Sequence, residues 1–381
     1  MPLGKSSKLL IRADLNVPIK NGKILDNFRI KKTLSNINHF KKYSKNITFI
    51  SHLGRPKGKD EDLSLKHLIS EMSDIAGQEV HFINDCINLD PKLFEDEAKI
   101  FLLENLRFYE GEEQNNLDFA KNLSNPFDTF ILDAFGAAHR SHASIVSMGK
   151  FLDSYQGPLM QKEVDNLQYL LSETKSPYTV ILGGAKISEK LNLVNNLLPK
   201  VDNLILGGGM CFTFLKALGL NIGSSLLEEN FISTASNLIN SKYGKKIILP
   251  IDFATTKDIS SNLRIEKDIQ DFDFDDIGVD IGKKTVERFK QTINISKTIF
   301  WNGPMGIFEN SNFEFGTKEI TKLVSNSDSY TVVGGGDSVS AINKFSTLDK
   351  FNHVSTGGGA SIEFLEGKIL PGVNIYKPLI I

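Results

Sequence analysis

The chain has 381 residues and nearly balanced charge, with 44 Lys and Arg against 46 Asp and Glu. A chain of this length exceeds what one hydrophobic core usually holds, so we expect two domains. Neither half carries a large basic excess, which argues against a protein dedicated to binding nucleic acid.

The only cysteines, Cys86 and Cys211, stand beside apolar residues. Two such cysteines argue against a disulfide framework or a cysteine-based metal site and favour a reducing compartment. The N-terminal sequence MPLGKSSKLL lacks an apolar stretch with a cleavage site, and no apolar run reaches transmembrane length. We therefore expect a soluble cytoplasmic protein in which both thiols are inert packing groups.

Four apolar runs in the first half end in polar residues, over 8–16, 46–55, 99–107 and 129–140. A near-continuous apolar run is typical of a strand that is buried on both faces. In open parallel sheets, ligands bind at the carboxyl ends of the strands. We therefore expect one site for a small polyanion, to which the strand ends contribute Asp14, Asn16, His52, Arg55, Arg107 and Arg140.

The use of arginine supports that expectation. The chain has only seven arginines, and five fall in the first 140 residues: Arg12, Arg29, Arg55, Arg107 and Arg140. The planar guanidinium binds carboxylate or phosphate oxygens two at a time, whereas lysine suffices for ordinary surface charge. Arg29 differs in lying on a helix-like stretch that begins near Asn27. The alternative is five unrelated surface ion pairs.

The second half uses glycine where the first uses arginine. Apolar runs end in glycine clusters over 178–184, 203–209, 330–336 and 353–359, and a fifth run ends at Gly306. Glycine lets backbone N–H groups approach a phosphate closely, which favours a nucleotide site. The alternative is that each cluster only makes a tight turn.

Common nucleotide fingerprints are absent from these loops. The pattern GxGxxG fails because Phe212, Val339 and Ile362 occupy its last position at the three glycine triplets. The tripeptide GKS at residues 4–6 has no strand or upstream glycine before it, so we interpret it as a chance match to a phosphate loop. No catalytic-loop signature of the protein-kinase type occurs either.

Two further features point to phosphate chemistry. Lys186 and Lys190 are spaced to lie on one helix face near its N-terminus, where they could hold a polyphosphate or simply form a solvated face. Asp337 follows a glycine triplet and could bind phosphates through Mg²⁺. Alternatively, Asp337 or Ser338 caps the N-terminus of the next helix.

Nine motifs together resemble the phosphoglycerate kinase family, in the family's order and over nearly the whole chain: RADLNVP, SHLGRP, LENLRFY, DAFGAAHR, LGGAKIS, GGGMCFTFL, WNGPMGIFE, GGGDS and STGGGASIEFLEGK. The resemblance implies an α/β protein with two Rossmann-like doubly wound parallel-sheet domains that face each other across a cleft. It places the acid-substrate domain at 1–156, a connecting helix at 157–173, the nucleotide domain at 174–366 and a returning tail at 367–381. The apolar spacing of 157–173 fits an amphipathic helix.

The resemblance implies reversible, Mg²⁺-dependent transfer of a phosphoryl group between 1,3-bisphosphoglycerate and ADP, giving 3-phosphoglycerate and ATP, by direct in-line transfer after domain closure. The implied partners are these small molecules, with no nucleic acid, no membrane and a monomeric state. A non-catalytic binding module and an NAD-dependent dehydrogenase are the rival readings, and the missing fingerprint disfavours the second. The short segment before the first run and the apolar ending NIYKPLII depart from the family pattern.

The resemblance also assigns roles to particular residues. The acid-substrate site would comprise Asp14, Asn16, Arg29, His52, Leu53, Gly54, Arg55, Arg107 and Arg140. The nucleotide site would comprise Gly184, Ala185, Lys190, Gly208, Gly209, Leu226, Asn302, Pro304, Ile307, Glu309, Gly334, Gly335, Gly336, Asp337 and Ser338, with Asp337 toward the metal. Catalysis would rest on Arg29, Lys186, Gly336 and Gly359, while His52 would anchor substrate and not act as a base.

Overall fold

The computed structural model describes residues 8–95, 99–261 and 263–379. The GKS tripeptide therefore lies outside the described residues. The chain divides into two compact units, residues 1–165 with 369–381 and residues 166–368. Among the described residues, none of the helices is both long and apolar enough to cross a bilayer.

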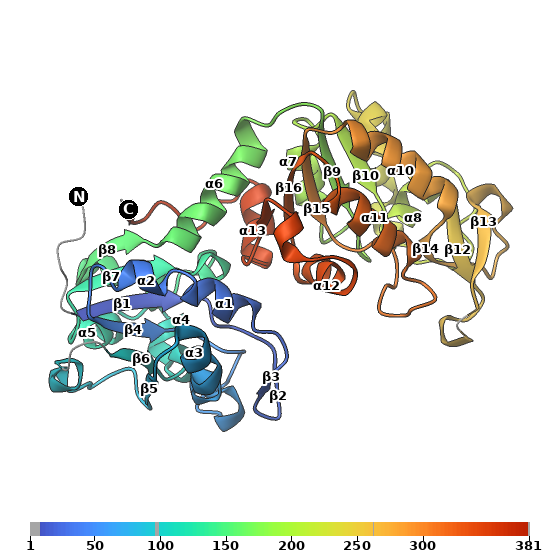
Figure 1. Ribbon diagram of the computed structural model, residues 1–381. Coiled ribbons are helices and arrows are strands. Elements are labelled where there is room, and N and C mark those ends of the chain that lie inside the picture. Colours follow the sequence, from blue (N-terminus) through green and yellow to red (C-terminus); the bar gives the residue numbers. More distant parts are fainter. Residues whose placement is uncertain (1–7, 96–98, 262, 380–381) are drawn as a thin grey trace. The chain divides into compact units, whose positions relative to one another are not determined.

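The first unit is built on a seven-stranded sheet with the order β18-β8-β7-β1-β4-β6-β5, in which all pairings are parallel (Figure 1). The strands are β1 (Lys8–Ala13), β4 (Asn46–Ile50), β5 (Val80–Ile83), β6 (Ile100–Leu103), β7 (Thr129–Asp133), β8 (Asp153–Gln156) and β18 (Lys377–Pro378). The four predicted strands β1, β4, β6 and β7 are neighbours. Their carboxyl ends consequently meet at one edge of the sheet, as the sequence predicts.

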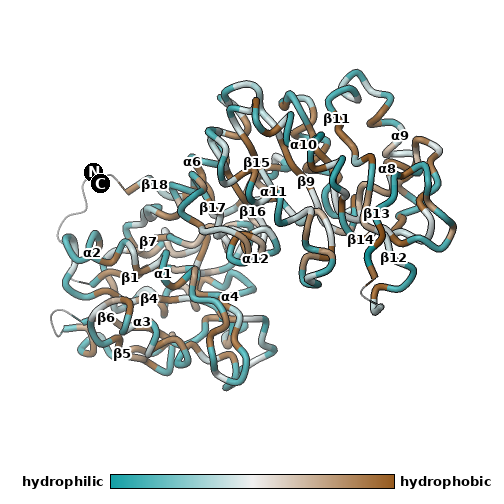
Figure 2. The backbone as a smooth tube through the Cα atoms, turned by 45° about the vertical axis from the view of Figure 1, so that its right-hand side comes forward, coloured by the Kyte–Doolittle hydropathy of each residue, from teal (hydrophilic) through white to brown (hydrophobic). Residues whose placement is uncertain are grey.

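The predicted burial on both faces is confirmed, because every residue of β4, β6 and β7 is buried. One core cluster joins Leu9 and Ile11 of β1 to Ile47 and Phe49 of β4. Figure 2 shows the same pattern as brown strands inside and teal segments outside. The sheet is thus a rigid base from which the loops at its edge project.

The helices of the first unit fill the connections between these strands. They are α1 (Phe28–Leu34), α2 (Ile37–Phe40), α3 (Ile69–Ala76), α4 (Glu110–Glu113), α5 (Leu117–Ser124) and the beginning of α6 (Pro158–Ser172). A short hairpin of β2 (Ile19–Lys20) and β3 (Lys23–Ile24) precedes α1. As predicted, the helix that carries Arg29 starts directly after Asn27.

A π-helix over Ala143–Ser147 follows β7 and is held by the C-terminal tail. The Tyr376 hydroxyl lies 3.0 Å from the Ile145 carbonyl oxygen and accepts a 3.2 Å hydrogen bond from the backbone N–H of Gly149. Burial raises the pKa of Tyr376 to about 12. The tail then adds β18 in parallel beside β8, and Leu379 packs into the core of the first unit.

The second unit has a six-stranded parallel sheet with the order β11-β10-β9-β15-β16-β17. Its strands are β9 (Tyr178–Leu182), β10 (Asn203–Leu206), β11 (Ile247–Ile248), β15 (Thr298–Asn302), β16 (Tyr330–Gly334) and β17 (His353–Val354). The five predicted glycine-terminated runs are all strands of this sheet. Their glycines therefore gather at its carboxyl edge.

The remaining elements surround that sheet. The helices are the end of α6, α7 (Leu191–Leu197), α8 (Cys211–Ala217), α9 (Ile232–Asn240), α10 (Lys283–Ile295), α11 (Phe315–Ser325), α12 (Gly336–Phe345) and α13 (Gly359–Leu365). A small antiparallel sheet of β13 (Ile265–Asp268), β12 (Asp252–Thr256) and β14 (Ile277–Ile281) was not expected from the sequence. Both cysteines are free and buried, which agrees with inert packing thiols.

Candidate active site

The polar edge of the first sheet is a hydrogen-bonded network. Arg29 donates from Nη1 to Asp14 Oδ1 over 2.8 Å and to the Asn16 carbonyl oxygen over 3.3 Å. The Asn16 side-chain oxygen in turn accepts a 2.9 Å hydrogen bond from the Gly54 N–H, and Arg107 donates to the Gly54 carbonyl oxygen. The ends of β1, β4 and β6 and the start of α1 are therefore joined at one place.

Asn105 fixes the loop after β4. Its side chain accepts from the Leu53 N–H at 3.2 Å and donates to the Leu53 carbonyl oxygen at 2.8 Å. Asn105 also accepts from the N–H of Arg107 at 3.1 Å. One buried amide thus positions both the loop of His52 to Arg55 and the turn that carries Arg107.

The electrostatic environment at this edge of the sheet is strongly positive. Burial, and then the nearby Arg140, lower the pKa of Arg107 to about 10. Burial, and then Arg107 and Arg140, lower the pKa of His142 to about 4. The pKa of His52 lies well below its usual value because the ring is buried beside Arg12 and Arg107. The arginines therefore keep their charge while both histidines are neutral at neutral pH.

Three buried polar atoms of Asp14 and Arg107 have no hydrogen-bond partner within the described residues: Asp14 Oδ2 and the Nε and Nη2 of Arg107. Buried donors and acceptors are normally paired, so each such atom calls for an explanation.

Arg55 is exposed on the loop after β4, and Arg140 is half-buried after β7. The edge can bind a small anion with several guanidinium groups.

The second unit contains a cavity of about 390 Å³ at the carboxyl edge of its sheet. Nine of the residues predicted for the nucleotide site line it: Gly184, Ala185, Gly208, Gly209, Leu226, Pro304, Ile307, Glu309 and Asp337. The lining is mostly apolar, and both Leu226 and Glu309 are exposed. Such a cavity suits a planar base with a polar sugar at its edge.

The sequence did not reveal half of the cavity wall. Phe212, Phe253, Ile259, Met305, Gly306 and residues 277–280 also line it. Asp280 is among them, and burial raises its pKa to about 7 while its Oδ2 accepts a 2.7 Å hydrogen bond from the Gly316 N–H. Phe253 and residues 277–280 come from β12 and β14, which carry no glycine cluster or charged motif that could have marked them. Phe212, Met305 and Gly306 lie inside quoted motifs, but their residue types alone did not assign them to the cavity.

The prediction that Lys186 and Lys190 lie on one face of a helix is wrong. Helix α7 begins only at Leu191, with Lys190 at its N-cap, and Lys186 lies in the loop before it. In this loop, the Glu228 carboxylate accepts hydrogen bonds from both the N–H and the hydroxyl of Ser188, at 3.1 and 2.5 Å. Gly184, with φ of +106°, adds a turn that a helix does not contain.

The two lysines consequently differ. Lys186 is exposed, whereas Lys190 is half-buried. Burial lowers the pKa of Lys190 to about 8, and the nearby carboxylate of Asp337 works against this shift. Asp337 lines the cavity, and Lys190 lies near enough for the charge of Asp337 to act on its amine.

The capping alternative for Asp337 and Ser338 is also wrong. Gly335 is the N-cap of α12, so both residues lie in its first turn. Ser338 instead accepts a 2.7 Å hydrogen bond from the Gly303 N–H through its hydroxyl. The Asn302 side chain donates to the Gly334 carbonyl oxygen at 2.7 Å, while its own buried oxygen has no partner within the described residues. The carboxylate of Asp337 remains available to a ligand.

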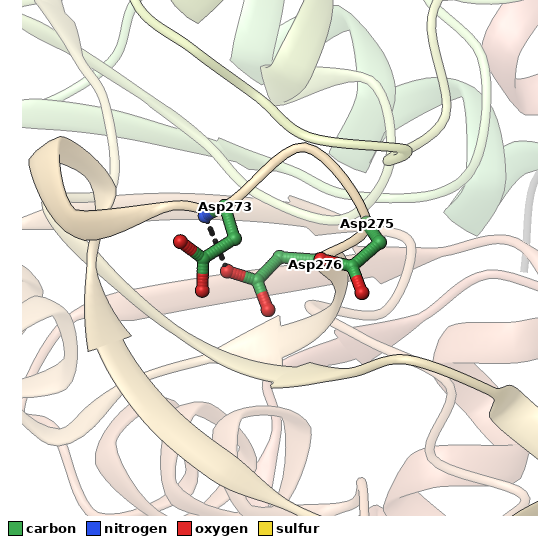
Figure 3. Close-up of side chains that lie close together, drawn as sticks. All are labelled: Asp273, Asp275 and Asp276. Atoms are coloured by element: carbon green, nitrogen blue, oxygen red, sulfur yellow. Dashed lines mark hydrogen bonds between the residues drawn. The ribbon is translucent and has the colours of Figure 1, made fainter.

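A separate carboxylate cluster precedes β14 and comprises Asp273, Asp275 and Asp276 (Figure 3). Lysines already neutralise it: Lys267 lies 2.7 Å from Asp273 and 2.8 Å from Asp276, and Lys257 lies 3.0 Å from Asp276. The backbone N–H of Asp273 also donates to Asp276 over 2.7 Å. This cluster is a salt-bridged turn in which the two lysines offset the charge of the carboxylates.

Comparison with known proteins agrees with this geometry. A sequence model of the phosphoglycerate kinase family matches residues 4–368. Phosphoglycerate kinase of Dictyoglomus turgidum is 44% identical over 380 residues, covering 98% of this chain and 96% of the relative. That of Finegoldia magna is 45% identical over 379 residues, covering 97% and 96%.

Solved structures give the same result. The structure of phosphoglycerate kinase from Coxiella burnetii matches with a TM-score of 0.89 and 36% identity, over 98% of this chain and 97% of the other. The enzyme from Pyrococcus horikoshii OT3 matches with a TM-score of 0.85 and 29% identity, over 98% and 96%. The chain therefore belongs to the phosphoglycerate kinase family.

Proposed function

We propose a division of the phosphoglycerate kinase reaction between the two units. The reaction of the family is reversible transfer of a phosphoryl group between ATP and the carboxyl group of 3-phosphoglycerate. In this proposal the first unit binds the acid and the second binds the nucleotide. The observation that carries it is that the arginine cluster with buried Arg107 belongs to one unit and the glycine-lined apolar cavity to the other.

The acid site is assigned to Asp14, Asn16, Arg29, His52, Leu53, Gly54, Arg55, Arg107 and Arg140. Arg107 supports the assignment best, because its lowered pKa and unpartnered Nη2 are both relieved by an anion. His52 is a poor base, because burial beside Arg12 and Arg107 holds its pKa well below its usual value and its Nδ1 already lies 2.9 Å from Arg12 Nη2. We assign it to binding the substrate.

The nucleotide site is assigned to the cavity and the loops around it. The base would lie against Ala185, Leu226, Pro304 and Ile307, with Glu309 near the ribose. Lys190, Asn302 and the backbone of residues 334–338 would hold the phosphates. An added Cβ at Gly336 or Gly359 would meet no atom within 4 Å, so packing does not require these glycines, and the open space beside them supports the assignment.

Asp337 fits a magnesium ion carried by the nucleotide. Its carboxylate has no hydrogen bond or ion pair within the described residues and lines the cavity. Mg²⁺ commonly binds one or two carboxylates together with substrate phosphates. When bound, the ion would neutralise charge on the phosphate oxygens.

The chemistry requires neither a covalent intermediate nor a strong base. The attacking oxygen of ADP and the departing carboxylate of 3-phosphoglycerate are both anionic, so positioning and charge stabilisation lower the barrier. We assign Arg29 and Lys186 to the oxygens of the transferred phosphoryl group. The amides at Gly336 and Gly359 would assist them.

A coupled assay tests the proposal by following consumption of 3-phosphoglycerate with ATP and Mg²⁺. We expect turnover that stops when the metal is chelated and returns when Mg²⁺ is added. Binding of both ligands without turnover would instead support a non-catalytic binding module. We further propose that the protein is a cytoplasmic monomer, which sedimentation and cell fractionation would test.

A further inference from the structure

We propose that Glu112 is a positioning residue for the acid site, acting through Ser144 and Arg12 to hold His52 as a neutral ring with its proton on Nε2. The inference rests on the proposed place of His52 in that site. It concerns a series of hydrogen-bonded side chains, and none of the sequence motifs indicated that these side chains act together. Three elements supply it: α4 gives Glu112, the π-helix gives Ser144 and β1 gives Arg12.

The series begins at a carboxylate that is fully buried. Glu112 Oε2 accepts a 2.9 Å hydrogen bond from the backbone N–H of Ser144, and Oε1 accepts a 2.6 Å hydrogen bond from the Ser144 hydroxyl. Burial raises the pKa of Glu112, but the charge of Arg12 and both Ser144 donors favour the ionised form. The single hydroxyl proton of Ser144 therefore points to Glu112, which leaves its oxygen lone pairs to accept.

Arg12 supplies the donor for that oxygen. Its Nε lies 3.0 Å from Ser144 Oγ, and its Nη1 donates to the Ala13 carbonyl oxygen and, over 3.2 Å, to Ser51 Oγ. The guanidinium is planar, so these contacts fix the direction of its remaining nitrogen as well. Nη2 then lies 2.9 Å from Nδ1 of His52.

The state of the histidine follows from donor counting. A guanidinium has five N–H donors and no acceptor, so Nδ1 of His52 must accept and cannot carry a proton. The proton of the neutral ring is therefore on Nε2. An N–H at Nε2 can donate to an anionic substrate, whereas the other tautomer would present a lone pair and repel it. The described residues offer Nε2 no hydrogen-bond partner of their own.

The same contacts explain why the acid site can contain a buried arginine that does not bind substrate. Arg12 is 1% exposed, and its guanidinium is occupied by Ser144, Ser51, Ala13 and His52. Its charge is balanced by Glu112, in contrast to the exposed Arg55. Arg12 therefore orients a neighbour, and Glu112 with Ser144 orients Arg12.

Nitrogen NMR of protein with ¹⁵N-labelled histidine tests this directly, with the His52 signals assigned through His52→Gln. In the wild type we expect unprotonated Nδ1 and protonated Nε2 between pH 5.5 and 8. Ser144→Ala and Glu112→Gln should both give a mixture of tautomers and raise the KM for 3-phosphoglycerate about tenfold, with the KM for ATP changed less than twofold. Ser147→Ala is the matched control, because this buried serine of the same π-helix bonds to Asn115 at 2.6 Å instead.

The outcomes separate the inference from the proposed function. A proton on Nδ1 in the wild type would overturn the inference, as would a raised KM in both variants with unchanged His52 signals. If Ser144→Ala does not fold, Glu112→Gln and the wild-type spectrum still decide. A wild type that shows the expected tautomer but does not consume 3-phosphoglycerate would refute the proposed function and leave the positioning of His52 intact.

Discussion

The arginines of the first unit differ in how their charge is balanced. Arg29 is paired with Asp14 at 2.8 Å, and Arg107 lies 3.4 Å from Glu113. Arg55 makes no hydrogen bond or ion pair within the described residues. A guanidinium without a partner contributes little to the free energy of folding, so we expect Arg55 to contribute to substrate binding.

Arg55→Lys is therefore expected to separate stability from binding. The free energy of unfolding should change by less than about 0.5 kcal/mol, because the residue is exposed. The affinity for 3-phosphoglycerate should fall by roughly 1–3 kcal/mol, since one point charge replaces a two-pronged donor. Titration calorimetry and thermal unfolding measure the two effects, with Lys57→Arg as the neighbouring exposed control. Unchanged affinity would remove Arg55 from the site.

Lys190 predicts a dependence of nucleotide binding on pH. Its pKa in the free protein is about 8, lowered by burial. Nucleotide phosphates should raise this pKa, so above about pH 8 binding must first protonate the amine and affinity should fall. The unfolded lysine titrates near 10.4, so between about pH 8 and 10.4 the unfolded state binds more protons and the free protein gains stability from this group as pH rises.

As pH rises above about 8, nucleotide affinity should therefore fall while the stability of the free protein rises, and the affinity can be measured directly. Calorimetric Kd values for ADP from pH 7 to 9.5 should increase above pH 8 in the wild type. Lys190→Gln should bind more weakly but with a flat profile over that range. A wild-type Kd that is constant to pH 9.5 would exclude Lys190 from the phosphate site.

Lys186 is expected to act on rate. It is exposed in a loop, and its charge is assigned to the phosphoryl group during transfer. Lys186→Ala should lower kcat at least ~100-fold and leave ADP affinity within a few-fold. Steady-state kinetics measures both, with exposed Lys200→Ala as the control. A raised KM at unchanged kcat would contradict the assignment.

Residue types could be predicted from the sequence, but their partners could not. The polar ends of β1, β4, β6 and β7 were identifiable because each follows an apolar run. Glu112 and Ser144 were not, since 32 residues separate them and neither belongs to a recognisable pattern. Contacts of this kind depend on how distant segments pack.

At the scale of elements, the start of α12 combines two glycines with different constraints. Gly335 has φ of +92°, and an added Cβ would lie 2.5 Å from the Asn302 side-chain nitrogen. Gly336 is helical, and an added Cβ would meet no atom within 4 Å. The fold therefore requires glycine at 335 but tolerates alanine at 336.

Gly336→Ala should consequently leave the free energy of unfolding unchanged or raise it by up to about 1 kcal/mol, since alanine favours helix. If phosphates approach the helix start, the same methyl group should weaken ATP binding at least about tenfold or lower kcat to a similar extent. Denaturant unfolding and kinetics give the two values, and exposed Ser340→Ala on the same helix is the control. A stable variant with full activity would show that no ligand comes close to Gly336.

The elements that the sequence predicts well are those with strong local patterns. The parallel strands of both sheets and the helix after Asn27 follow from apolar runs and from the polar or glycine residues that end them. The loop of Lys186 does not, because Gly184 before it has a positive φ and Ser188 within it bonds to Glu228, 40 residues away, and neither fact follows from the spacing of the lysines. The cavity wall from β12 and β14 was missed for a similar reason, since apolar strand residues look alike whether they line a cavity or a core.

For the whole molecule, the assignment of sites divides the reaction between two units. Asp14 to Arg140 lie within residues 1–165, whereas Lys186 to Asp337 lie within 166–368. The chain passes from one unit to the other within α6 and again after Lys368. Neither unit alone carries both sets of residues, so we expect isolated units to bind a ligand but not to transfer phosphate.

Transfer itself sets a distance that the two units must satisfy. Two domains of ~150 residues each have a radius of gyration near ~15 Å, so centres of adjoining domains are separated by roughly 30 Å, yet the reacting atoms must come within ~3–3.5 Å. Exclusion of water then protects the acyl phosphate from hydrolysis.

We therefore expect small-angle scattering to show a smaller radius of gyration with 3-phosphoglycerate and Mg-nucleotide together than with either alone. We expect the chain to bend near the two ends of α6 and around Gly367 to Gly372. Lys186→Ala, which should bind both ligands, is expected to compact like the wild type. An unchanged profile in a fully active mixture would show that the units need no rearrangement and that transfer occurs in the arrangement already present without ligands.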